Sequence, residues 1–414
     1  MRVTVNRLVV AAAVAVAVSG GLFAQPESAA TSTQSQLTEQ RQEAIAELER
    51  EIQAIESREG PNSAELIDPL SSLGSIYQEA GDHLFATAAI ERARHVVRVN
   101  AGLYSPEQAP LLRGLIRSAD ALGAIETAWD LEQELLGVAE RHPDTLQTAQ
   151  ILHETADRRV EMLMRYSGLA LIDLAVALGC ETKGPDYRLA PLPYQPACPT
   201  HLAEDAENYY LHSLYILLQN EPSASDERPI VLRKLLRTIY MYLGNDFAVA
   251  RGDRALRDFL AYQATNAEPV LARVDTLVQI ADWALLYSSY RKSDEQVLTV
   301  YQQAYDLLTT RPAGDAALEQ FFAPAIPVVL PSFLDNPLAS EQTQATTGHV
   351  DIAFEITKYG EARDVEILDS TSNATRADEQ RLAQFVLRSR FRPRVTNGQL
   401  TDSDQIVVRY YLGE

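Results

Sequence analysis

Apolar positions recur every three or four residues through most of the chain, which is the spacing of one face of an amphipathic helix. Residues 37–58 carry this stripe, and so do residues 204–219, 230–243 and 247–263. Almost no alternation of period two interrupts the stripe before residue 336. We therefore predict a mostly helical body over residues 36–336.

Residues 67–100 show a more specific pattern, in which small residues stand where two helices of a pair would cross closely and larger apolar residues fill the groove between them. These positions are Leu70, Leu73, Gly74, Tyr77, Gly81, Ala86, Ile90 and Ala93. Weaker copies follow in residues 112–128 and 142–156, and residues 277–308 again fit two paired helices. The pattern resembles the tetratricopeptide repeat, which implies an α-solenoid whose concave surface binds a peptide or protein. An irregular helical domain without true repeats is the alternative.

The hydrophobic period changes near the C-terminus. A polar stretch, residues 339–347, is predicted to be a linker, and apolar residues then alternate with polar ones as on a half-buried strand. The predicted elements are strands at 350–356, 362–368 and 405–412 and a helix at 378–389. The order strand, strand, helix, strand predicts a small α+β domain over residues 348–414.

Five residues mark the boundaries of these elements: Gly348, Gly360, Phe391, Pro393 and Gly398. The run Arg-Phe-Arg-Pro at 390–393, followed by Asn-Gly, is the most specific part of the pattern. These residues resemble the C-terminal domain of the TonB family, over the last 67 residues of the chain. The resemblance implies a fold and not a catalytic site: Phe391 would close the helix–sheet core, Pro393 would direct the chain away from the helix, and Gly398 would form a turn.

The resemblance also implies a partner. In the TonB family this domain lies in the periplasm and docks partner peptides by adding a strand to its sheet edge. A full energy transducer needs an inner-membrane helix as well, usually followed by a proline-rich spacer. Here the predicted helices take the place of that spacer, and the N-terminal apolar run lacks the histidine of the family's anchor. We therefore expect docking by strand addition, with energy transduction as the alternative function.

The N-terminus has the composition of an export signal. Arg2 and Arg7 precede an uncharged apolar run, residues 8–24, which ends in a glycine pair and a small residue before Gln25. We predict a cleaved signal peptide at residues 1–24 and a periplasmic protein of a Gram-negative envelope. The run is also at the short limit of a membrane-spanning helix, about 17–25 residues, so an inner-membrane anchor is the alternative.

Charge excludes one class of partner. The 414 residues include 36 Lys and Arg against 57 Asp and Glu, for a net charge of -21. Nucleic acid binding through the bulk surface is excluded, because phosphate contacts need clustered basic residues. An acidic groove would favour basic protein partners, although an acidic surface also simply keeps an exported protein soluble.

The two cysteines, Cys180 and Cys198, flank a proline-rich segment without a C-x-x-C pair. In an oxidising compartment this arrangement predicts a structural disulfide, which would stabilise the fold by roughly 3 kcal/mol.

One basic cluster follows the predicted C-terminal helix. Its members are Arg388, Arg390, Arg392 and Arg394. Residues 347–414 hold 9 basic and 11 acidic residues, so this part is nearly neutral beside the acidic helical body. Two interpretations stay open: the arginines dock on the helical body or an acidic partner, or they form a solvated helix end stabilised by the helix dipole.

Sequence patterns of catalytic sites are absent. The chain has no Walker loop, no G-x-G-x-x-G, no G-x-S-x-G and no H-E-x-x-H. Acid pairs such as Glu204 and Asp205 are expected on solvated helix faces. We predict a non-enzymatic adaptor without cofactor or metal, which binds proteins or peptides of the envelope or outer membrane and contacts the membrane only if its leader is retained.

Overall fold

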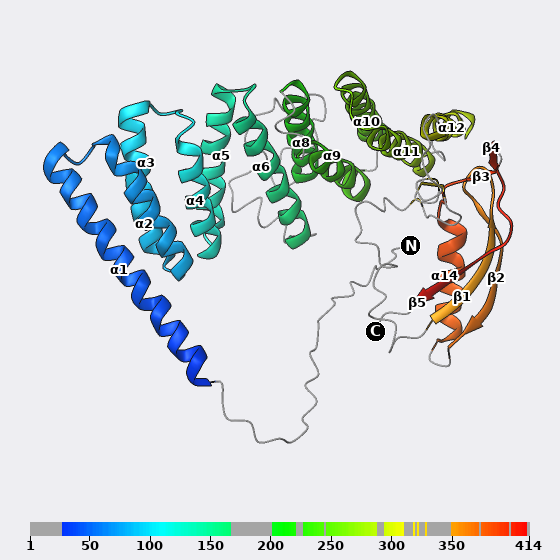
Figure 1. Ribbon diagram of the computed structural model, residues 1–414, viewed down its shortest axis with the longest axis horizontal. Coiled ribbons are helices and arrows are strands. Elements are labelled where there is room, and N and C mark those ends of the chain that lie inside the picture. Colours follow the sequence, from blue (N-terminus) through cyan, green and yellow to red (C-terminus); the bar gives the residue numbers. More distant parts are fainter. Residues whose placement is uncertain are drawn as a thin grey trace. The chain divides into compact units, whose positions relative to one another are not determined.

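The computed structural model describes residues 27–166, 201–220, 227–243, 246–287, 294–309, 318, 321–322, 328, 349–371, 374–396 and 399–411. The chain separates into two compact units, residues 1–96 and 97–414, and each is described by itself. It is mostly helical with a small C-terminal α+β part, as predicted (Figure 1). The predicted leader and linker, Cys180, Cys198, Gly348 and Gly398 lie outside the described residues. No helix of the described part is long and apolar enough to span a membrane.

The first unit contains helices α1 (Glu27–Glu59) and α2 (Ile67–Ala80), a 3-10 turn η1 (Ala64–Leu66) and most of α3 (His83–Ala101). A Cβ added at Gly74 would overlap Ile90 of α3, so glycine is required where α2 and α3 approach. Gly81 ends α2 in the left-handed conformation, with φ 80°.

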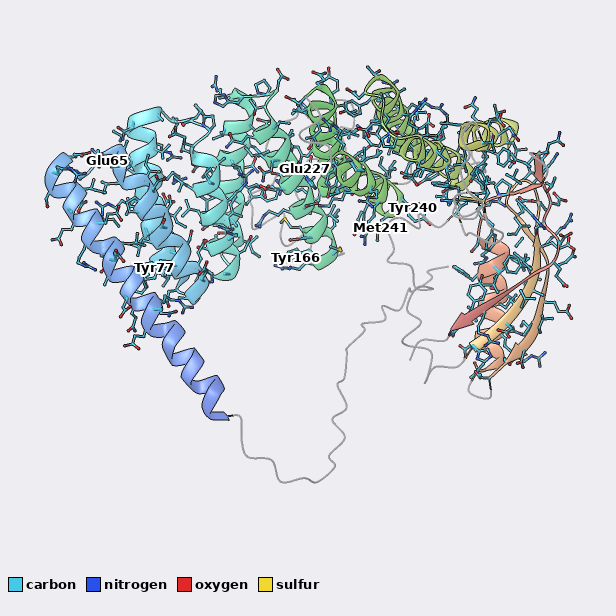
Figure 2. The ribbon with its side chains drawn as sticks, viewed as in Figure 1. Glu65, Tyr77, Tyr166, Glu227, Tyr240 and Met241 are labelled. Carbon is cyan, nitrogen blue, oxygen red and sulfur yellow. The ribbon has the colours of Figure 1, made fainter. Side chains whose placement is uncertain are left out.

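The helices of the second unit pack against one another in chain order. They are α4 (Gln108–Ala121), α5 (Ile125–Arg141), α6 (Leu146–Arg165), α8 (Leu202–Gln219), α9 (Glu227–Thr238), α10 (Asp246–Thr265), α11 (Val270–Leu286) and α12 (Asp294–Thr309). A π-helical segment, η4 (Ile239–Leu243), prolongs α9 and exposes Tyr240 and Met241 (Figure 2). A Cβ at Gly252 would lie 2.6 Å from the ring of Trp283, so this glycine allows α10 to approach α11.

The C-terminal part contains a three-stranded antiparallel sheet of order β2-β1-β5 and one helix against it. Its elements are β1 (His349–Ile356), β2 (Ala362–Ser370), α14 (Arg376–Arg388) and β5 (Ile406–Tyr411). The core consists of alternate residues of β1 together with Val386 and Phe391. The predicted strand, strand, helix, strand order is confirmed.

The structure adds one element to that prediction. A short hairpin of β3 (Arg394–Thr396) and β4 (Gln399–Thr401) lies between α14 and β5. Its strands flank the predicted Asn397–Gly398 turn. Each strand has three residues, which is too short for an alternating pattern to be recognised in the sequence.

Candidate functional site

The four arginines of the basic cluster have different surroundings. Arg388 is the last residue of α14 and is exposed. Arg390 pairs with Glu361 at 2.8 Å, and Arg394 pairs with Asp404 at 2.8 Å, both within the C-terminal part. Arg392 instead reaches α11, where it binds Asp282. Of the four arginines, only Arg392 therefore contacts the helical body, and Arg390 and Arg394 bind acidic residues of the C-terminal part itself.

The Arg392–Asp282 pair is buried and tightly bonded. Arg392 Nη2 donates to Asp282 Oδ2 at 2.7 Å, and its Nε lies 3.1 Å from both carboxylate oxygens. Tyr301 of α12 donates its hydroxyl to Asp282 Oδ1 at 2.6 Å. The side chains of Arg392 and Asp282 are only 11% and 6% exposed. One carboxylate thus joins α11, α12 and the C-terminal part.

Electrostatics favour the charged pair. Burial alone would lower the pKa of the Arg392 guanidinium, but the charge and hydrogen bonds of Asp282 outweigh burial, and the pKa is raised. Burial also raises the pKa of the Tyr301 hydroxyl, and the Asp282 charge adds to this effect. Tyr301 therefore stays neutral and donates its proton to the carboxylate.

Apolar contacts surround the ion pair. Val395 of β3 and Leu400 of β4 pack against the core that α11 and α12 form. Gly360, between β1 and β2, has φ 75°, and a Cβ there would overlap the carbonyl oxygen of Phe391 and lie 2.8 Å from Leu285 Cδ2 of α11. The hairpin that sequence reasoning missed therefore supplies much of the apolar junction.

The outer edge of β5 is a second feature of the site. Among the described residues, β5 forms a ladder only with β1, so its other edge has no described strand partner. Val407 is 57% exposed on this strand. Val408 and Tyr410 point toward the helix-covered core, and burial raises the pKa of Tyr410 to about 12.

A polar cluster lies across β1 and β2. His349, Asp351 and Asp369 bring possible metal-ligand atoms within 4.8 Å of one another. Arg409 of β5 donates to both oxygens of Asp351, at 2.7 Å each, and these hydrogen bonds lower the pKa of Asp351. The Arg409 guanidinium thus supplies the positive charge beside the Asp351 carboxylate.

A buried ionic network lies between α5, α6 and α8. Glu132 is 1% exposed and pairs with Arg159, which is 0% exposed and stacks 4.0 Å from the ring of Trp129. Asp205 of α8 is 4% exposed, and burial raises its pKa to about 7. The expectation that the pair Glu204–Asp205 lies on a solvated face is therefore wrong for Asp205.

The physical reason is helical spacing. Asp205 lies four residues before Tyr209, which is buried, and beside the buried Ala206. A position on this apolar stripe turns inward whatever its polarity. The stripe through α8 was the signal in the sequence that could have identified Asp205.

No protein family and no curated protein matches the sequence of the chain. Similarity to known proteins is found among solved structures. Among solved structures, the crystal structure of BtubC (BKLC) from P. vanneervenii is similar over 66% of this chain and 93% of that chain. The sequence identity is 14% and the TM-score is 0.35.

Proposed function

We propose that this protein is an adaptor of the bacterial envelope that receives an extended peptide along the free edge of β5. The observation that carries the proposal is the position of β5, which pairs with β1 on one side only within the described residues. A free strand edge presents unpaired backbone donors and acceptors, and these bind another strand. The resemblance of residues 348–414 to the TonB C-terminal domain supports the same docking mode.

Side chains beside the edge set the preference of this site. Val408 and Tyr410 lie on the face of β5 that packs toward α14, where the Tyr410 ring meets Phe385 edge-on at 6.4 Å. A strand added beside β5 would place alternate side chains next to these two residues. We expect apolar or aromatic residues at those alternate positions of the peptide.

The helical part would serve as the second binding body. Consecutive helices pack pairwise, and glycines admit close approach at residues 74 and 252. These features and the sequence pattern support a tetratricopeptide-like array. The buried Arg392–Asp282 pair then fastens the strand-binding part to that array.

Alternate backbone methylation tests the strand-addition mechanism. Peptides that bind the full-length chain are selected from a displayed random library and resynthesised with N-methyl groups at every second residue, in two registers. Only one register directs its N–H groups to β5, so we expect that series to lose binding and the other to retain it. Equal binding by both series would refute strand addition. Amide hydrogen exchange should slow in residues 406–411 and stay unchanged in residues 362–370 on the opposite edge.

The N-terminus of the protein in its host distinguishes the adaptor from the energy transducer. We expect residues 1–24 to be removed and the chain to be recovered from the periplasm. Intact Met1 in the inner-membrane fraction would favour a transducer of the TonB type.

A further inference from the structure

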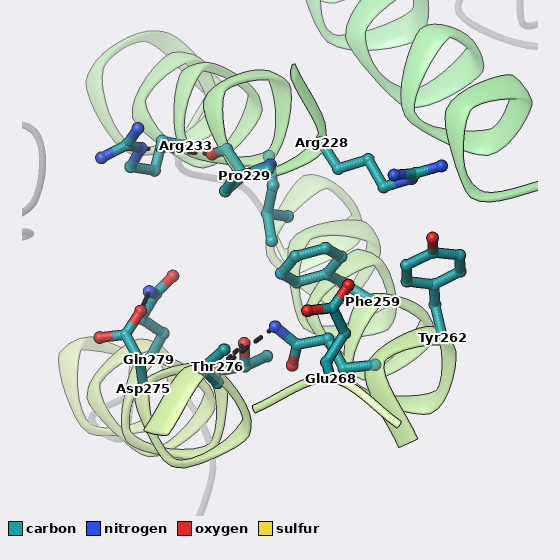
Figure 3. Close-up of a pocket in the computed structure, with 12 residues that line it drawn as sticks. Arg228, Pro229, Arg233, Phe259, Tyr262, Glu268, Asp275, Thr276 and Gln279 are labelled. Atoms are coloured by element: carbon teal, nitrogen blue, oxygen red, sulfur yellow. Dashed lines mark hydrogen bonds between the residues drawn. The ribbon is translucent and has the colours of Figure 1, made fainter. Parts of the chain in front are cut away.

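A pocket of about 550 Å³ lies between α9, α10 and α11 (Figure 3). Its apolar walls are Leu232 and Phe259, which are 2% and 8% exposed. Glu268 points its carboxylate toward Phe259, and Asp275 and Gln279 lie across the opening. The pocket therefore combines apolar walls with a carboxylate on either side of its opening.

A buried amide adds an acceptor without a partner. Gln263 is 4% exposed and lines the pocket, and its Oε1 accepts no hydrogen bond from any residue that the structure describes. Its Nε2 is directed elsewhere, to the Ala272 carbonyl at 3.4 Å. An acceptor left buried without a donor is unfavourable, and a bound donor would satisfy it.

Two arginines of the pocket lining donate to backbone carbonyls. Arg228 donates to the carbonyls of Leu217 and Asn220 at 2.8 and 2.9 Å, and its guanidinium stacks over Tyr262. Arg233 donates to the Pro229 carbonyl of its own helix at 3.2 Å. These N–H groups are thus committed to backbone carbonyls, whereas the buried hydroxyl of Tyr262 has no hydrogen-bond partner among the described residues.

The amide of Gln279 is committed too, since its Nε2 donates to Asp275 Oδ2 at 2.6 Å. This bond holds the Asp275 carboxylate at the rim. Opposite, Glu268 is fixed by its backbone N–H, which bonds to the Gln263 carbonyl at 3.0 Å after a left-handed residue, Ala267. The Asp275 carboxylate and the backbone at Glu268 are therefore positioned before any ligand arrives.

We propose that this pocket binds an arginine side chain of a protein partner. A guanidinium carries five donors in a plane, which suits the carboxylates of Glu268 and Asp275 together with Gln263 Oε1. Its flat face stacks on the Phe259 ring, while the aliphatic stem contacts Leu232. The assignment rests on the proposed role of the helical part as a binding body, and it specifies the partner as a basic segment.

Three capped tripeptides test the assignment on the full-length chain: acetyl-Gly-Arg-Gly-amide, its citrulline analogue and its lysine analogue. Citrulline has nearly the shape of arginine without the charge. We expect the arginine peptide to bind at least about tenfold more tightly than the citrulline peptide, as measured by nuclear magnetic resonance titration. Equal binding of these two peptides, or no binding of the arginine peptide at millimolar concentration, would overturn the assignment. A lysine peptide that binds more tightly than arginine would overturn the guanidinium geometry.

Charge-neutral variants locate the binding. Glu268→Gln should weaken the arginine peptide about tenfold, and Gln263→Leu should weaken it measurably while the thermal unfolding temperature stays unchanged or rises. Glu126→Gln is the matched control, because Glu126 is an exposed glutamate in the first turn of α5, outside the pocket. An equal loss in Glu126→Gln would show a general charge effect and overturn the site.

The result is independent of the strand-addition experiment. Binding of the arginine peptide without register-dependent peptide binding would leave the pocket assigned and refute docking at β5. The reverse result would refute the pocket alone.

Discussion

The Arg392–Asp282 pair gives the sharpest prediction for stability. Removing one partner from a buried ion pair leaves the other charge desolvated, which costs about 3–5 kcal/mol. The pair meets that condition, because the side chains are 11% and 6% exposed and joined by three short nitrogen–oxygen contacts. In Arg392→Met, the buried carboxylate would keep the Tyr301 hydroxyl, at 2.6 Å, as its one side-chain donor among the described residues. We expect the free energy of unfolding to fall by about 3–5 kcal/mol.

A double-mutant cycle isolates the interaction. Asp282→Asn keeps an oxygen for Tyr301 but removes the charge, and the double variant leaves no unpaired ion. We therefore expect the double variant to lose less than the sum of the single variants, with a coupling of about 2–3 kcal/mol. Urea unfolding followed by tryptophan fluorescence is a suitable assay, because the neighbouring Trp283 is 1% exposed on α11.

The pair Arg394–Asp404 provides the control. Its nitrogen–oxygen distance is similarly short, at 2.8 Å, but its side chains are 36% and 92% exposed. Arg394→Met should therefore cost less than about 1 kcal/mol. If Arg392→Met costs no more than this control, or if the two single effects add, then the buried pair does not fasten the C-terminal part to α11.

Three further predictions concern single sites. Burial raises the pKa of Asp205 from 3.8 to about 7 in the folded state, so the free energy of unfolding should decline by about 3 kcal/mol between pH 4 and pH 7 through this group, and Asp205→Asn should remove that decline in urea titrations at several pH values. Gly360→Ala should destabilise the chain by about 2–4 kcal/mol in calorimetry, because the left-handed backbone and the contact with Leu285 both disfavour a Cβ; no change in unfolding temperature would contradict the geometry. Phe391→Ala should cost about 3–5 kcal/mol, since the ring is 1% exposed and packs 5.1 Å from Phe354, and an unaltered melt of the C-terminal part would show that the ring is not core.

Local periodicity explains why most elements could be predicted. Apolar residues repeat at regular spacing along helices such as α8 and α10 and along the strands β1 and β2. This spacing indicates which side of each element is buried. The strands β3 and β4 have three residues each, which is too short for a repeated apolar pattern. Their apolar residues pack against the core that α11 and α12 form. A short element that is buried by residues distant in the chain shows no hydrophobic periodicity in its own sequence.

The same distinction applies to the site. Arg390, Arg392 and Arg394 stand at equal spacing, and nothing in that spacing separates the buried arginine from the exposed ones. Arg392 differs from the other two because it binds Asp282, which lies 110 residues away in the chain. Asp205 differs, because its place on the apolar stripe of α8 was readable and only its charge argued against burial.

Helix α11 carries residues of both the proposed arginine pocket and the anchor of the C-terminal part. Asp275 and Asp282 are seven residues apart, so they lie on the same face two turns from each other. Asp275 borders the arginine pocket, whereas Asp282 holds Arg392. Burial raises the pKa of Asp275, and the positive charge of Arg392 opposes this rise. The pocket and the anchor of the C-terminal part therefore share one helix, with their carboxylates two turns apart.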